Sequence, residues 1–283
     1  MKAYKFPVIF TILAVLASCG GKDGSSQQKK EEQTIDPRAV RKSENVLNLA
    51  TYNVGVFNKS GVNSLFDIVR MMKTLDLDAI SLNELDSCNT RSGKGVYQLK
   101  DFAGEMGKWN YNFGGAIAYR EGTYGIGAAT PHKILNKWSI KLPKSDDKEV
   151  RALSVIETEK FVFCNTHLGL TEKSQKDQIT VINNFVKEHF AKCAKPVFLC
   201  GDMNAEPHHA AIAQLEESWE ILNDKDTFTF STSNPVKCID YIMLYRDAKG
   251  CNVIRSFVGN DLGKGVAVTA SDHFPVFVQV ELN

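Results

Sequence analysis

Short apolar runs rich in β-branched residues recur along most of the chain and predict β-strands. These runs are Val46 to Val54, Ala79 to Leu82, Ala116 to Tyr119, Ala152 to Ile156, Phe161 to Asn165, Val197 to Cys200, Ile239 to Leu244 and Phe274 to Val280. Two stretches between them have helical spacing instead, namely Leu65, Ile68, Val69 and Met72, and Ile179, Ile182, Phe185 and Val186. Many strands with few interspersed helices favour an α/β sandwich over an all-parallel, doubly wound sheet.

The N-terminus has a different pattern. Lys2 and Lys5 precede an apolar run from Phe6 to Leu16, which is shorter than a membrane-spanning helix and is typical of a signal peptide. The run ends in Leu16-Ala17-Ser18-Cys19, which resembles a bacterial lipobox. We therefore predict a lipoprotein signal peptide over residues 1–18 and a lipid on Cys19, which would anchor the protein to a bacterial membrane, facing the periplasm or the cell exterior. An ordinary signal peptide with a chance cysteine is the alternative.

Composition then divides the remaining chain in two. Residues 19–44 are predicted to be a flexible tether, because Gly20 to Gln33 is rich in Gly, Ser, Lys, Gln and Glu. Residues 45–283 contain no second linker and no repeat, which predicts one domain. The formal charge of +1 falls to −1 when Lys2 and Lys5 are removed with the signal peptide. Such a balance provides no overall positive field for binding nucleic acid.

Polar residues follow several of the predicted strands directly. Asn53, Glu84, His167 and Asp202 each stand where an apolar run ends, so their side chains could meet at one edge of a sheet. Asp202 and Asn204 are two residues apart, which in an extended segment puts a carboxylate beside an amide on the same side. Such a pair can hold a water molecule and donate to a phosphate oxygen. The alternative is an Asx-turn that closes the loop before Pro207.

Six short motifs occur in an order that points to a family. They are Thr51-Tyr52-Asn53-Val54, Leu82-Asn83-Glu84-Leu85-Asp86, Asn165-Thr166-His167-Leu168, Gly201-Asp202-Met203-Asn204-Ala205, Ile239-Asp240-Tyr241-Ile242 and Ser271-Asp272-His273-Phe274-Pro275-Val276. Together they resemble the endonuclease/exonuclease/phosphatase superfamily, which includes deoxyribonucleases, inositol polyphosphate 5-phosphatases and neutral sphingomyelinases. The resemblance implies an α/β fold, a deoxyribonuclease-like four-layer α/β/β/α sandwich, with the active site in a cleft at one edge of the sheets.

The resemblance also implies a metal site. It makes Glu84 the principal ligand of Mg²⁺ or Mn²⁺, with Asn53 and Asp272 close by, and hard oxygen ligands suit such ions. It pairs Asp240 with His273, which would fix the imidazole tautomer and raise its pKa. His273 would then act either as a base or as a phosphate ligand.

The remaining groups complete the implied reaction. His167 would stand on the opposite side of the phosphate, where it stabilises charge or assists the leaving oxygen, and Glu121 is a candidate partner for it. A water molecule oriented by Asp202 and the metal would attack phosphorus in line, while Asn204 and the histidines stabilise the developing charge. No covalent enzyme intermediate is required.

One segment departs from the family pattern. Many relatives carry Tyr-Gly-Asn-Ala followed by Leu-Ser-Arg, whereas this chain has Ile126 in place of the asparagine and Pro131 in place of the arginine. Substrate contacts therefore do not transfer from any single branch. Arg120 or Arg151 could supply a phosphate contact instead, although each could equally be an ordinary surface arginine.

These observations predict a metal-dependent hydrolase of phosphate esters, either a phosphodiesterase or a phosphatase. The expected substrate is a small or lipid-linked phosphorylated headgroup outside the cytoplasm, and the expected state is a monomer held at the membrane by the lipid on Cys19. An extracellular nuclease is the alternative, less favoured because the mature chain is not basic. A non-catalytic binding lipoprotein is a third hypothesis, but it requires lost catalytic groups, and here all eight predicted side chains are present.

Overall fold

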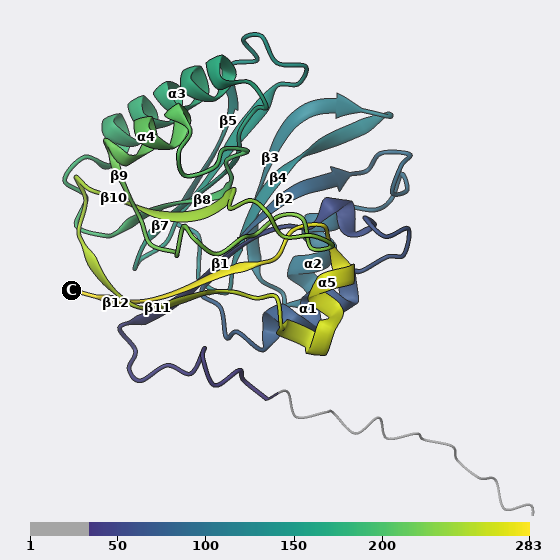
Figure 1. The fold of residues 1–283 in the computed structure, drawn as a ribbon, viewed down its shortest axis with the longest axis horizontal. Coiled ribbons are helices and arrows are strands. Elements are labelled where there is room, and N and C mark those ends of the chain that lie inside the picture. Colours follow the sequence, from purple (N-terminus) through teal and green to yellow (C-terminus); the bar gives the residue numbers. More distant parts are fainter. Residues whose placement is uncertain (1–33) are drawn as a thin grey trace, which may run out of the picture. The chain divides into compact units, whose positions relative to one another are not determined.

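Two six-stranded sheets form the centre of the fold in the computed structural model, which describes residues 34–283 (Figure 1). The first sheet contains, in spatial order, β11 (Cys251–Val258), β12 (Val276–Leu282), β1 (Val46–Asn53), β2 (Ala79–Ser87), β4 (Gly122–Thr130) and β3 (Asn110–Tyr119). The second contains β5 (Asn136–Leu142), β6 (Arg151–Glu157), β7 (Val162–His167), β8 (Val197–Asp202), β10 (Asp240–Tyr245) and β9 (Trp219–Ile221). Both sheets mix parallel and antiparallel pairs.

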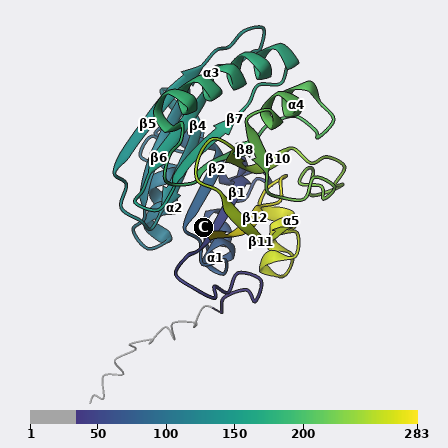
Figure 2. The ribbon, with the colours of Figure 1, turned by 90° about the vertical axis from the view of Figure 1, so that its left-hand side faces the viewer.

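Helices cover the outer face of each sheet (Figure 2). They are α1 (Leu65–Lys73), α2 (Gln98–Glu105), α3 (Glu172–Phe190), α4 (Ala210–Glu216) and α5 (Val266–Ala270), with short 3-10 turns at η1 (Gly55–Phe57) and η2 (Leu262–Gly265). Apolar side chains of α1, α2 and α5 share one core with the first sheet, and those of α3 and α4 share a second core with the second sheet. The predicted four-layer α/β/β/α sandwich is confirmed.

The layer order explains the sequence pattern. Strands β1, β7, β8 and β10 are buried along their whole length because each lies between a helix layer and the other sheet. Strands buried on both faces are largely apolar instead of alternating, and the sequence predicted all four of these strands. The sequence did not predict β4, whose Gly-Thr-Tyr-Gly-Ile-Gly run lacks strand propensity, or the exposed strands β5 and β11.

Parallel pairing brings the polar strand ends together. β1 lies parallel to β2 with Asn53 opposite Asn83, and β7 lies parallel to β8 with His167 opposite Asp202. The carboxyl ends of these four strands therefore meet at one edge of the two sheets. This is the convergence that the sequence predicted.

Two buried asparagines connect the sheets at this edge. Nδ2 of Asn83 in β2 donates to Oδ1 of Asn165 in β7 (3.0 Å) and to the carbonyl oxygen of Thr166 (2.9 Å). Nδ2 of Asn165 donates in turn to the carbonyl oxygens of Leu82 (3.0 Å) and Gly127 (2.6 Å). Both asparagines are fully buried, so these hydrogen bonds are protected from water and satisfy polar groups in the interior between the sheets.

The chain before β1 already contacts the sandwich. Ala39 is buried, its carbonyl oxygen accepts a hydrogen bond from Nδ2 of Asn48 (2.8 Å), and Arg41 pairs with Asp78 (3.0 Å). The segment predicted as a tether therefore meets the domain several residues before residue 44. The predicted signal peptide, Cys19 and the start of the tether lie outside the described residues. Within residues 34–283, no helix has the length and apolar character needed to cross a membrane.

The asparagine pair yields a stability prediction. Asn165→Ala should lower the free energy of unfolding by about 2 to 4 kcal/mol, because it leaves the carbonyl groups of Leu82 and Gly127 without their donor in a dry interior. Asn252→Ala is the matched control, since that side chain is exposed and bonds only the exposed Asn283 (2.9 Å). Urea unfolding followed by tryptophan fluorescence measures both. Equal losses for the two variants would contradict a structural role for the buried pair.

Candidate active site

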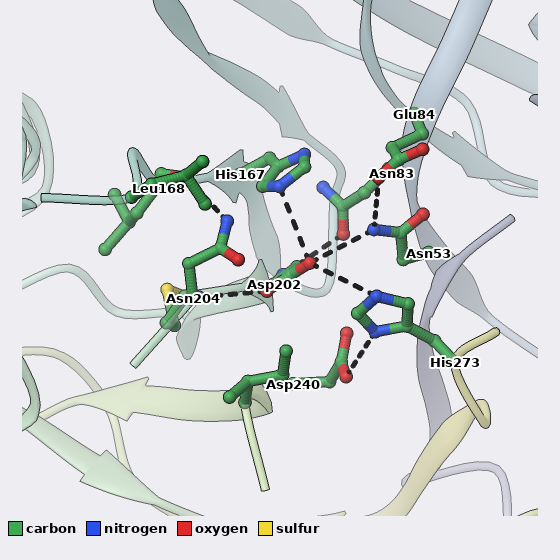
Figure 3. A network of polar contacts seen from close by, with 12 residues as sticks. Asn53, Asn83, Glu84, His167, Leu168, Asp202, Asn204, Asp240 and His273 are labelled. Carbon is green, nitrogen blue, oxygen red and sulfur yellow. Dashed lines mark hydrogen bonds and ion pairs between the residues drawn. The ribbon is translucent and has the colours of Figure 1, made fainter. Parts of the chain in front are cut away.

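Asp202, the last residue of β8, is the centre of a buried polar network (Figure 3). Its Oδ2 lies 3.5 Å from Nε2 of His167, 3.7 Å from Nε2 of His273 and 3.1 Å from Nδ2 of Asn53. The two histidines lie on opposite sides of the carboxylate. Oδ1 accepts the backbone N–H of Asn204 (2.9 Å), so the Asx-turn considered from the sequence also forms. Oδ1 therefore closes the turn, while Oδ2 faces the two histidines and Asn53.

Asp240 and His273 form the pair that the family resemblance implied. Nδ1 of His273 lies 2.9 Å from Oδ2 of Asp240, which is fully buried at the start of β10. Burial alone would lower the pKa of His273, but the negative charges of Asp240 and Asp202 outweigh it and raise that pKa to about 10. The imidazole is therefore protonated at neutral pH and presents an N–H toward Asp202 and the cavity. A cation of this kind suits a phosphate ligand better than a base.

The other two groups titrate differently. Burial, with the negative charge of Asp240, raises the pKa of Asp202 to about 7, despite the opposing effect of His273. Burial, with the positive charge of Arg151, lowers the pKa of His167 well below its usual 6.5. His167 is thus neutral at pH 7, while Asp202 can exchange a proton near that pH. Neighbouring groups with separated pKa values are typical of acid and base assignments in hydrolases.

Glu84 and Asp272 provide a second, more open group of carboxylates. Glu84 sits in a bulge of β2 with φ of 58°, a strained conformation for a non-glycine residue that turns its side chain out of the sheet. Nζ of Lys59 lies 2.9 Å from Oδ2 of Asp272 and 3.9 Å from Oε2 of Glu84. Burial alone would lower the pKa of Lys59, but these carboxylates raise it. The position thus attracts a cation.

The donor set fits a hard divalent ion. Glu84 and Asp272 supply carboxylate oxygens, and Oδ1 of Asp272 is buried without a hydrogen-bond partner. Mg²⁺ favours such oxygens and completes its coordination with water and phosphate. The ligand atoms of Asp202, Asp240 and His273 also lie within 4.8 Å of one another. We consider this cluster a poorer site for a hard ion than Glu84 and Asp272. Nδ1 of His273 is hydrogen-bonded to Asp240, and hard ions prefer oxygen ligands to nitrogen.

Asn53 lies between two carboxylates of the site. Its Nδ2 donates to Oε1 of Glu84 and to Oδ2 of Asp202, both at 3.1 Å, while its Oδ1 accepts the backbone N–H of Gly55 (3.1 Å). The amide oxygen thus already accepts one hydrogen bond. Asn53 positions the two carboxylates in this arrangement, and its predicted role as a metal ligand stays a prediction.

Two further predictions concern His167 and Asn204. Glu121 does not approach His167: it is exposed and pairs with Lys94 (2.6 Å). Nδ2 of Asn204 donates to the carbonyl oxygen of Leu168 (2.9 Å), the residue after His167. This bond holds the amide at the edge of the cavity and ties the β8 loop to the end of β7. Asn204 thus lines the cavity with one amide hydrogen engaged by the chain itself, and its role in charge stabilisation stays a prediction.

Of the eight predicted site residues, all except Asn53 and Asp240 line one cavity of about 350 Å³. The cavity is also lined by residues that the sequence did not assign: Lys59, Tyr124, Glu149, Leu170, Glu206, His209, Phe230, Lys237 and Ile239. Arg151, one of the two arginines considered as a phosphate contact, lines it as well. Loop residues such as Lys59 have no periodic pattern around them, so only the folded chain reveals their position.

Asp202 should be unfavourable for the stability of the metal-free protein. A carboxyl group whose pKa rises from 3.8 to about 7 on folding resists ionisation in the folded state, so its cost appears as the pH rises from 3.8 and is complete above 7. Asp202→Asn should therefore raise the free energy of unfolding by roughly 1 to 3 kcal/mol at pH 8 and much less at pH 4. Urea unfolding in EDTA at both pH values measures this, and a loss of stability at pH 8 would contradict the electrostatic account.

Comparisons with known proteins agree with this geometry. Residues 50–273 match the endonuclease/exonuclease/phosphatase family, and no curated protein matches the chain by sequence. A family protein from Beutenbergia cavernae is similar in structure, with a TM-score of 0.66, 19% identity, and coverage of 84% of this chain and 72% of that one.

Two structures from Bacteroides thetaiotaomicron are also similar. A family protein has a TM-score of 0.65, 21% identity, and coverage of 84% and 98% of the two chains. A mannosyl-6-phosphatase has a TM-score of 0.61, 19% identity, and coverage of 83% and 99%. At these identities the structures establish the fold, and the family match covers most of the chain. The protein belongs to the endonuclease/exonuclease/phosphatase family of phosphoric ester hydrolases.

Proposed function

We propose that this protein hydrolyses phosphate esters on a small or lipid-linked headgroup outside the cytoplasm, with Mg²⁺ or Mn²⁺ as its cofactor. One observation carries the proposal. Asp202, with a histidine on each side, lines the same cavity as the two carboxylates that attract a cation, Glu84 and Asp272. Hydrolysis at phosphorus needs both an oriented water molecule and positive charge at the phosphate oxygens, and this cavity offers a place for each.

Each side chain of the site has a separate role in the proposed reaction. Asp202 orients the attacking water and accepts its proton, as its raised pKa allows. His273, held as a cation by Asp240, donates its N–H to a phosphate oxygen. His167, neutral on the far side of Asp202, donates a hydrogen bond to the leaving oxygen, which takes its proton from solvent. A divalent ion held by Glu84 and Asp272 would supply Lewis-acid charge at the phosphate.

The size and charge of the cavity favour a small headgroup. About 350 Å³ is at the lower end of the volumes of small-molecule sites and accommodates a phosphate with a compact organic group. Glu149 and Glu206 on its lining would repel the successive phosphates of a nucleic-acid strand. The mannosyl-6-phosphatase neighbour supports this choice, because its name describes action on a phosphorylated sugar. An extracellular nuclease is the alternative that the assay below separates.

Removing the metal or its main ligand should abolish turnover. Protein lacking residues 1–33, assayed with Mg²⁺ or Mn²⁺, should hydrolyse phosphorylated headgroups, and EDTA should eliminate this activity. Glu84→Gln should lower kcat/KM by about 100-fold or more, because it removes one carboxylate from the cation site. Glu121→Gln is the matched control, since that carboxylate is exposed and paired with Lys94.

The substrate panel should contain phospholipids, inositol phosphates, sugar phosphates, bis-para-nitrophenyl phosphate and plasmid DNA. Turnover that survives EDTA, or a Glu84→Gln variant as active as Glu121→Gln, would overturn the metal-dependent mechanism. Cleavage of DNA without activity on any headgroup would establish the nuclease alternative. No turnover on the whole panel would sink the enzymatic proposal.

We propose the membrane location from the sequence signals around Cys19. A lipid on Cys19 would hold a monomer at a bacterial membrane and bring the cavity near lipid-linked substrates. Cys19→Ser should move the protein from the membrane fraction to the soluble fraction, because acylation requires the thiol. The measurement is fractionation of cells that express each form. Equal membrane association of the two forms would contradict a lipid anchor at this residue.

A further inference from the structure

Arg151 occupies a special position at the edge of the cavity. It is the first residue of β6, and the pairing of Leu153 with Thr166 places it level with Leu168, one residue past His167. The side chain lines the cavity together with both histidines and Asp202. It is only 7% exposed, and its charge contributes to the lowered pKa of His167. Arg151 is therefore a fixed positive charge on the His167 side of the site.

The hydrogen-bonding capacity of this guanidinium is largely unused. Its Nε is buried and has no hydrogen-bond partner among the described residues. Nη1 of Arg151 forms a long ion pair with Oε2 of Glu149 at 3.6 Å, and the Glu149 side chain is 45% exposed. A buried cation with so weak a partner is unfavourable unless an anion completes its shell. The fork of N–H donors on an arginine matches the oxygens of a phosphate group.

The number of phosphate oxygens then distinguishes two substrate classes. A phosphodiester has two non-bridging oxygens and one negative charge, whereas a terminal phosphomonoester has three and approaches two negative charges at neutral pH. The cation site at Glu84 and Asp272 can take one oxygen, and so can Nε2 of His273, which lines the cavity while Nδ1 is held by Asp240. Arg151 supplies a third donor. A phosphodiester has no third non-bridging oxygen to pair with it, whereas a terminal phosphate has one.

Other cations do not offer the same contact. Arg120 lies in the turn between β3 and β4, is exposed, and stacks on the ring of Tyr119 at 5.4 Å. Lys237 lines the cavity but is exposed to solvent, and Lys59 is paired with Asp272. The choice between Arg120 and Arg151, which the sequence left open, is therefore decided by burial and position.

We propose that Arg151 binds the third non-bridging oxygen of a terminal phosphate, and that the protein is accordingly a phosphomonoesterase. This inference rests on the proposed hydrolase function and names its substrate class. Arg151 acts as a specificity-determining residue: it favours phosphomonoesters over diesters of the same alcohol.

The test compares para-nitrophenyl phosphate with bis-para-nitrophenyl phosphate in the presence of Mg²⁺. The unaltered protein should have the higher kcat/KM on the monoester. Arg151→Gln should lower monoester kcat/KM by about 100-fold, the loss of a charge-assisted hydrogen bond, and change diester kcat/KM by less than about 3-fold. Arg151→Lys should recover part of the monoester activity, and Arg120→Gln should match the unaltered protein on both substrates.

The ratio of the two kcat/KM values does not depend on how much of a variant is folded, so a poorly folding variant still gives an answer. Equal losses on both substrates, or a preference of the unaltered protein for the diester, would overturn the inference.

Binding of inorganic phosphate provides a readout without turnover. Isothermal titration calorimetry in Mg²⁺ should give a dissociation constant at least about 10-fold weaker for Arg151→Gln than for the unaltered protein. If the protein hydrolyses neither substrate but binds phosphate through Arg151, the proposed function fails and the phosphate site stands. If the two forms bind phosphate equally, the site assignment fails even where turnover is present.

Discussion

The hydrogen bond between Asn83 and Asn165 joins the two sheets beside the Asp202 carboxylate. Asn83 donates to Asn165 from β2 and accepts the backbone N–H of Asp202 from β8 (3.1 Å). Because both side chains are buried, a relative shift of the sheets would leave several polar groups unpaired. The distance between Glu84, on the first sheet, and Asp202, on the second, depends on this pair. The active site is therefore a property of the sheet interface.

The fold shifts the pKa values of neighbouring groups in opposite directions. Burial makes ionisation of Asp202 unfavourable, which raises its pKa and makes it a stronger base for water. The charges of Asp240 and Asp202 keep His273 protonated, while His167 stays neutral beside Arg151. Under the proposed function, the stability lost by burying these charges is a cost of holding a preorganised electrostatic field at the phosphate. Cations at Lys59 and Arg151 border this network on two sides.

Much of the site could be predicted because it is built on strand ends. The apolar runs located β1, β2, β7, β8 and β10, and the polar residues after them identified Glu84, His167 and Asp202. The pairing of Asp240 with His273 came from the family resemblance, and the structure contains it. Edge strands such as β5 and β11 escaped notice because half-exposed strands carry a weaker apolar signal.

What could not be predicted depends on contacts between distant segments. The family resemblance placed Asn53 at the metal site, but a motif does not orient an amide, which has both a donor and an acceptor, so its hydrogen bonds to two carboxylates were not foreseen. Lys59 lies in a loop without periodicity, and the bulge that turns Glu84 outward arises from pairing with β4. Glu121 was a wrong partner for His167 because the turn after β3 carries it toward Lys94. The sequence offered no reason to prefer Arg151 over Arg120 as a phosphate contact, and only the burial of Arg151 at the cavity distinguishes the two arginines.

The central claim is that a water molecule at Asp202 attacks phosphorus directly, with the metal and histidines stabilising the phosphate. Single-turnover hydrolysis in ¹⁸O-labelled water with Mg²⁺ tests it most directly, because mass spectrometry shows which product receives solvent oxygen. The account predicts one labelled oxygen in the phosphate product and none in the alcohol. Label in the alcohol, or unchanged labelling and rate in Asp202→Asn, would contradict it.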